Sequence, residues 1–148
     1  SPSDIHQEIS VKLTFLLYGF IMKHQLGKIF HAPFDVEFDD ENVYQPDLLF
    51  VSHEKLHLIQ GRMKGAPDFI IEILSQNKKY ELGEKKDVYG QFGVREFWAI
   101  DPDLKTLTFF ENKKGKMAET MIYTHNQTVS SKVIKGFELK MQDLFPND

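Results

Sequence analysis

GAPDFIIEILS, residues 65–75, is the stretch that decides the fold. From Pro67 onward it is a nearly continuous apolar run, which is typical of a strand buried on both faces of a sheet. YQPDLLFV, which starts at Tyr44, is a second apolar run bounded by polar turns. We expect these two strands to form the centre of the sheet.

Helical and strand patterns on either side of these runs predict a mixed α/β fold. After Ser3 or Asp4 as a candidate cap, apolar residues recur at helical spacing and predict a helix to about His24. A second helix is predicted from about Lys79 to Phe92. Further strands are expected in VREFWAID, TLTFFEN and MAETMIYT, and a short strand with a terminal helical turn is expected in GFELKMQDLF.

The composition is that of one globular domain. The chain has 148 residues, of which 41% are hydrophobic and 27% are charged, and this is enough for a single core. It has no cysteine, which excludes disulfides and thiolate metal sites, and its longest apolar run, FLLYGFIM, is too short to cross a bilayer. We therefore expect no membrane partner and a cytoplasmic setting. The net charge of -4 argues against a surface coated in basic residues for non-specific nucleic-acid binding.

The stretch HEKLH, residues 53–57, raises the hypothesis of a zinc peptidase, because H-E-x-x-H on a helix presents two histidines to one zinc ion. Such a site also needs a stable helix and a third protein ligand. Here the motif lies in a short connection between the two central strands. A surface turn is therefore the favoured interpretation, and the zinc peptidase is kept as a third alternative.

Each central strand carries an acid within apolar sequence, Asp47 in PDLLF and Glu72 in IIEIL. A carboxylate at such a position is costly to bury unless it is paired, hydrogen-bonded or bound to a cation. Strand alternation places Asp68 on the same face as Glu72. Because Asp68 directly follows Pro67, where capping of a turn is common, it is a second-tier candidate.

The second predicted helix has an apolar stripe formed by Leu82, Val88, Tyr89 and Phe92. Lys85 falls at the centre of this stripe, whereas Lys86 points to its side. A lysine that buries only its stem is the alternative interpretation. Because this helix directly follows the strand that holds Glu72, we expect Lys85 to lie near the two acids.

Two carboxylates beside one lysine are the groups needed to hydrolyse a phosphodiester. Asp47 and Glu72 would hold Mg²⁺ or Mn²⁺, which binds a phosphate oxygen and lowers the pKa of a bound water. Lys85 would position that water or offset the charge that develops on the phosphate. The residues thus predict a metal-dependent nuclease.

These residues resemble the PD-(D/E)XK nuclease superfamily, and within it the Uma-two group of restriction-endonuclease-like proteins. The similarity is carried by QPDLLFV, GAPDFIIEILS, YELGEKKDVYGQFGVREFWAIDP and GFELKMQDLF, and it runs over nearly the whole chain. It implies a single restriction-endonuclease-like domain over residues 1–148, with a core of helix, three strands, helix and strand. It also implies catalysis by Asp47, Glu72 and Lys85.

The sequence departs from the superfamily at Leu74, where the usual E-x-K pattern has lysine. In this group the lysine is expected to have moved to the following helix, at Lys85. The resemblance also makes His6 and Glu8, on the first predicted helix, second-tier candidates, because an acid from this helix joins the metal site in related nucleases. For His6 a satisfied core histidine, and for Glu8 a solvated side chain, are the alternative interpretations.

The leading hypothesis is a magnesium- or manganese-dependent endodeoxyribonuclease that acts on DNA as a homodimer, because cutting two strands usually needs two sites. The homodimer comes from the resemblance and not from the residues. The alternative is a catalytically inactive nucleic-acid-binding or accessory protein that keeps the fold, which Leu74 and the acidic pI of about 5.9 favour.

Overall fold

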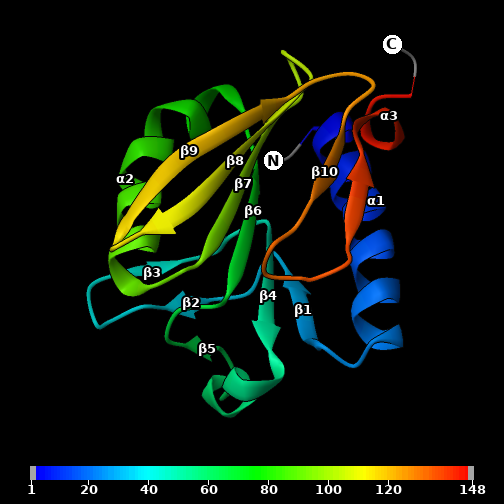
Figure 1. The fold of residues 1–148 in the computed structure, drawn as a ribbon. Helices are drawn as coiled ribbons and strands as arrows, with labels where there is room; N and C mark the ends of the chain where they lie inside the picture. The colour runs from blue at the N-terminus through cyan, green and yellow to red at the C-terminus, as the bar shows by residue number, and fades with distance from the viewer. Residues whose placement is uncertain (1–2, 147–148) are drawn as a thin grey trace.

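The computed structural model describes residues 3–146, and the side chains of these residues apart from 76–81. Figure 1 shows a large sheet with helices on both sides. The elements are α1 (Asp4–Lys23), β1 (Gly27–His31), β2 (Val36–Glu37), β3 (Val43–Tyr44), β4 (Leu48–Ser52), the 3₁₀ helix η1 (His53–Leu58), β5 (Met63–Lys64), β6 (Phe69–Ile73), α2 (Gln76–Phe92), β7 (Glu96–Asp101), β8 (Thr106–Lys113), β9 (Lys116–Tyr123), β10 (Thr128–Ser130), β11 (Glu138–Lys140) and α3 (Met141–Leu144).

The main sheet has the strand order β1-β4-β6-β7-β8-β9. Strands β6 and β7 are parallel and are joined by α2, while the other neighbours in this sheet pair antiparallel. A parallel pair needs a crossover of a dozen or more residues, which α2 supplies. The mixed α/β fold is therefore confirmed, and the two apolar runs form interior strands.

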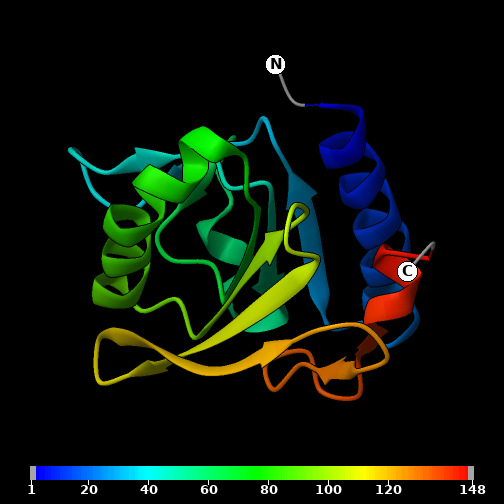
Figure 2. The same ribbon diagram turned by 90° about the horizontal axis from the view of Figure 1, so that it is seen from above.

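Strand alternation divides the core between the two faces of the sheet. Phe69, Ile71 and Ile73 of β6 pack under α1, whereas Ile70 packs in the cluster that α2 covers. Figure 2 shows α1 and α2 as separate layers on opposite sides of the sheet. Glu72 alternates with Ile71 and Ile73 and therefore faces α2.

Helix α1 begins as its sequence predicts. The side chain of Ser3 accepts a hydrogen bond from the backbone N–H of His6 at 3.1 Å, and Asp4 adds a negative charge in the first turn. Ile9, Leu13, Leu17 and Ile21 form its buried face. Among the described residues, no helix is long and apolar enough to cross a membrane.

The prediction of one strand from Tyr44 onward was wrong. Tyr44 belongs to β3, which pairs with β2, and β4 begins only at Leu48. Pro46 explains the break, because it has no N–H to donate to a neighbouring strand. The start of α2 was predicted too late, since the helix begins at Gln76 and not at about Lys79, and the short strands β5 and β10 were not predicted.

Glu96 is a buried acid that fastens the chain after β10 to the main sheet. Its carboxylate accepts hydrogen bonds from the backbone N–H groups of Lys132 and Val133 at 2.9 and 3.0 Å, and from the hydroxyl of Ser131 at 2.9 Å. Burial raises the pKa of Glu96 above its usual value, although these donors oppose the shift.

This raised pKa predicts how stability changes with pH. The folded state holds the Glu96 proton to higher pH than the unfolded chain does, so the free energy of unfolding falls as pH rises from about 4.5 through the folded pKa. We expect the wild-type protein to lose stability over this window relative to Glu96→Gln, as measured by urea denaturation from pH 4 to 7. Exposed Glu119→Gln is the control. Parallel curves for wild type and Glu96→Gln would contradict the assignment.

Candidate active site at the end of the β4–β6 ladder

At one end of the β4–β6 pairing, backbone N–H groups donate hydrogen bonds to side-chain carboxylates of the opposite strand. The pairing of β4 with β6 ends at Leu48, the first residue of β4, which lies opposite Ile71. One residue further, the backbone N–H of Asp47 donates to Oε1 of Glu72 at 3.3 Å, and the N–H of Ile73 donates to Oδ2 of Asp47 at 2.7 Å. Each buried carboxylate thus takes the place of a backbone carbonyl of its own strand.

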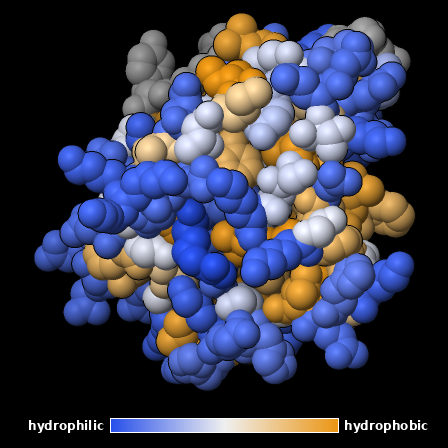
Figure 3. Space-filling view, viewed as in Figure 1, coloured by the Kyte–Doolittle hydropathy of each residue, from blue (hydrophilic) through white to orange (hydrophobic). Residues whose placement is uncertain are grey.

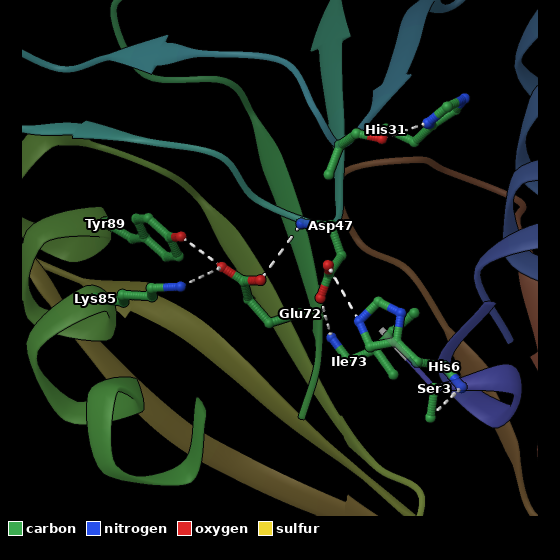
Figure 4. Close-up of polar contacts among 9 residues, drawn as sticks. Ser3, His6, His31, Asp47, Glu72, Ile73, Lys85 and Tyr89 are labelled. Carbon is green, nitrogen blue, oxygen red and sulfur yellow. Dashed lines mark hydrogen bonds and ion pairs between the residues drawn. The ribbon is translucent and has the colours of Figure 1, made fainter. Parts of the chain in front are cut away.

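Helix α2 supplies two groups to the other oxygen of Glu72. The hydroxyl of Tyr89 donates to Oε2 at 2.6 Å, and Nζ of Lys85 lies 3.8 Å from the same atom. The two residues are four apart and therefore lie on one face of the helix. Figure 4 shows both side chains directed from α2 toward the Glu72 carboxylate. Lys85 thus lies where the apolar stripe predicts it.

Helix α1 reaches the site through His6. Its Nε2 lies 3.3 Å from Oδ1 of Asp47, while Ile73 holds the second oxygen. The polar contacts therefore run from α2 through Glu72 and Asp47 to α1, as the dashed lines in Figure 4 trace. The structure brings His6 together with Asp47, Glu72 and Lys85.

The structure does not bring Asp68 or Glu8 to this cluster. Asp68 lies toward the other end of β6, where it accepts a hydrogen bond from the N–H of Ser52 at 2.6 Å and pairs with Arg95 at 3.0 Å. Glu8 is exposed and lies 3.5 Å from Lys12, one turn along α1. Both contacts account for these acids without a role at the site.

The HEKLH stretch forms the 3₁₀ helix η1. With three residues per turn, residues four apart in a 3₁₀ helix point about 120° apart, so His53 and His57 do not share a face as they would in an α-helix. Among the described residues, no group of three or more His, Cys, Asp or Glu side chains is placed to hold a metal ion.

Tyr89 is the site residue that sequence reasoning missed, since it was placed only in the apolar stripe. Its side chain is fully buried. Burial raises its pKa well above the ordinary value, and the negative charge of Glu72 raises it further, so the hydroxyl keeps its proton and donates. A signal was present, because a buried tyrosine hydroxyl needs a partner and Tyr89 stands one turn after Lys85.

A groove of about 580 Å³ opens on this cluster between α1 and the chain that follows β1. His6 and Asp47 lie in its wall, together with Val11, Phe15 and Pro33. The Asp47 side of the cluster can therefore be reached from outside, whereas Glu72 is buried beneath α2.

Comparison with known proteins decides the family of this chain. The family Uma2, described as "Putative restriction endonuclease", matches residues 1–142. The chain belongs to the Uma2 family. This confirms the resemblance carried by the motifs. The catalytic use of Asp47, Glu72 and Lys85 stays a prediction.

A solved structure supports the fold of this Uma2 chain. The chain is similar to a protein described as a "putative nuclease belonging to DUF820" from Anabaena variabilis ATCC 29413, with a TM-score of 0.84 and 20% identity. The match covers 98% of this chain and 82% of the other. At this identity the likeness concerns the fold alone. A search of curated proteins found no match.

The Tyr89 contact generates a test of stability. We expect Tyr89→Phe to lower the free energy of unfolding by about 1.5–3 kcal/mol, because it removes a buried hydrogen bond to a charged group. Urea denaturation at pH 7 measures the change. Tyr123→Phe, which alters the hydroxyl of a partly exposed tyrosine of β9, is the matched control and should have little effect. Equal effects of the two substitutions would show that the Tyr89 hydrogen bond adds nothing.

Proposed function

We propose that this protein is a metal-dependent endodeoxyribonuclease in which Asp47 and Glu72 hold Mg²⁺ or Mn²⁺ and Lys85 acts on the reacting phosphate. The observation that carries the proposal is the position of Nζ of Lys85, 3.8 Å from a carboxylate that is itself linked to Asp47. Membership of a family described as restriction endonucleases supports DNA as the substrate. The proposed setting is the cytoplasm.

The donor set fits a hard cation better than zinc. Carboxylate oxygens from two neighbouring strands are what Mg²⁺ prefers, and this ion is commonly held by one or two carboxylates, with waters and substrate phosphate filling its remaining positions. Two protein carboxylates are therefore sufficient. The bound ion would polarise a phosphate oxygen and lower the pKa of a water.

The protein's own groups would orient the metal ligands and stabilise the charge that develops on the phosphate. The N–H groups of Asp47 and Ile73 fix the orientation of the carboxylates, and Tyr89 holds Oε2 of Glu72, so the acids are preorganised before substrate arrives. Lys85 would turn its ammonium from Glu72 toward the phosphate and donate hydrogen bonds to an oxygen on which negative charge grows. His6 would orient Asp47 from the α1 side.

A second candidate function is binding of nucleic acid without turnover. Leu74 occupies the position where the superfamily usually has its lysine, and this favours a protein that has lost catalysis. We propose that Lys85 replaces the missing ammonium. DNA binding without cleavage in the assays below would favour the second candidate.

The role of Lys85 can be tested against its neighbour. Lys86 lies on the same helix with its ammonium 5.4 Å from the centre of the Phe110 ring, away from Glu72. We expect Lys85→Met to reduce plasmid cleavage in Mg²⁺ or Mn²⁺ by about 100-fold or more, since it removes a charge that stabilises the transition state. Lys86→Met should cleave like wild type. Cleavage that persists in EDTA, or equal activity of the two variants, would refute the role given to Lys85.

Metal binding provides a test that does not depend on cleavage. Isothermal titration with Mn²⁺ should show binding to the wild type and a loss of about tenfold or more in affinity in Asp47→Asn and in Glu72→Gln, because each removes an anionic ligand. Glu84→Gln, an exposed acid on the same helix as Lys85, should bind like wild type. If Mn²⁺ binding survives in both site variants, Asp47 and Glu72 are not the ligands.

A further inference from the structure

Helix α1 is apolar on two sides, and the described residues cover only one of them. Besides its buried face, the helix carries a second line of large apolar side chains, which we name the α1 seam and which consists of Val11, Phe15, Tyr18 and Met22. Their exposed fractions lie between 50% and 77%. A helix that is apolar on opposite sides is normally buried on both.

Nothing in the described part of the chain covers this seam. Figure 2 shows α1 as the outermost layer on its side of the sheet, and apolar surface is visible on that side of the molecule in Figure 3. The four side chains expose on the order of 400 Å², the size of the largest apolar patch on a typical monomer, and such patches are often functional. This is about half of what each partner contributes to a stable interface of standard size, ~800 Å².

Two grooves extend the apolar surface along one flank of the seam. Val11 and Phe15 line the groove that contains Asp47, while Tyr18 and Met22 line a second groove of about 360 Å³ against β1. Charged residues are few along this surface, as in the core of a protein interface. The four seam residues include no Lys or Arg, which argues against nucleic acid as the occupant of the seam, because its backbone requires basic groups.

We propose that the α1 seam is the surface through which two copies of this chain associate, with the two α1 helices antiparallel. The spacing of the seam residues is the same read in either direction, so a two-fold axis between Phe15 and Tyr18 maps the seam onto itself. Phe15 of each copy then meets Tyr18 of the other, and Val11 meets Met22. A closed two-fold dimer requires a self-complementary surface of this kind.

Charge supports the antiparallel direction. Asp4 lies on the same line of the helix, two turns before Val11, while Lys28 lines the groove beyond Met22 at the other end of the seam. Antiparallel pairing brings Asp4 of one copy toward Lys28 of its partner, twice per dimer. It also places the two helix dipoles side by side and antiparallel, so that the positive end of each helix lies near the negative end of the other. Parallel helices would place like ends together.

The inference locates an interface for the proposed homodimer and does not rest on nuclease chemistry. Sedimentation velocity across micromolar concentrations should show dimers of the wild type, and Phe15→Glu should weaken dimerisation by about tenfold or more, since it puts two charges at the centre of the interface. Leu104→Glu is the matched control, because Leu104 is 71% exposed and its turn borders α1 on the side of Ile5 and Ile9, not on the seam. Circular dichroism melts check that both variants fold.

Several outcomes would overturn this proposal. A wild type that stays monomeric, a Phe15→Glu variant that dimerises like wild type, or an equal loss in Leu104→Glu would each do so. If a monomeric wild type loses DNA binding on Phe15→Glu, the occupant of the seam is nucleic acid instead. None of these results depends on whether the protein cleaves DNA.

Disulfide trapping tests the direction of the helices. The chain has no cysteine, so introduced thiols report only on each other. Antiparallel pairing predicts that a mixture of Val11→Cys and Met22→Cys forms a disulfide-linked dimer under oxidation, whereas neither variant does so alone. If Val11→Cys is trapped alone as readily as the mixture, the antiparallel arrangement is wrong.

Discussion

The reciprocal hydrogen bonding of Asp47 and Glu72 is the interaction on which the rest of the structure depends. Each carboxylate accepts from a backbone N–H of the opposite strand, so the β4–β6 ladder ends in side chains rather than carbonyls. Loss of either acid would leave a buried N–H without its acceptor, at a cost of ~1–3 kcal/mol. The pair therefore fixes the point at which β4 and β6 stop pairing. Both helices contact this pair, α1 through His6 and α2 through Tyr89.

This arrangement is expensive for a protein that only needs to fold. Two buried carboxylates at facing positions lose hydration, which is costly unless donors or cations compensate them. Apolar side chains of similar size would often be at least as stable there. Retaining the acids, and placing Lys85 beside Glu72, is understandable where the groups bind a cation or a phosphate.

The sequence predicted what depends on periodicity and failed where tertiary contacts decide. The strand of Glu72, the Ser3 cap and the inward direction of Lys85 follow from local patterns, and the structure has all three. Asp68 shows the limit, because alternation gives the face of a side chain and not its place along the strand, and four residues span about 13 Å. The contacts of His6 and Tyr89 with the acids depend on long-range packing, so the sequence made His6 only a second-tier candidate and placed Tyr89 only in the apolar stripe.

Helix α1 shows why assembly and chemistry can be linked in so small a domain. Its first turn holds His6 against Asp47, its inner face anchors the sheet, and the α1 seam borders the groove that opens on Asp47. A partner seated on the seam would therefore bury the outer side of the helix that positions His6, and would form part of the surroundings of Asp47. Because a packed helix moves as a rigid element, pairing at the seam would restrain the position of His6 as well. If two copies pair at the seam, we expect dimerisation to affect the order of the Asp47 side of the site and not that of the Glu72 side, which is held by α2.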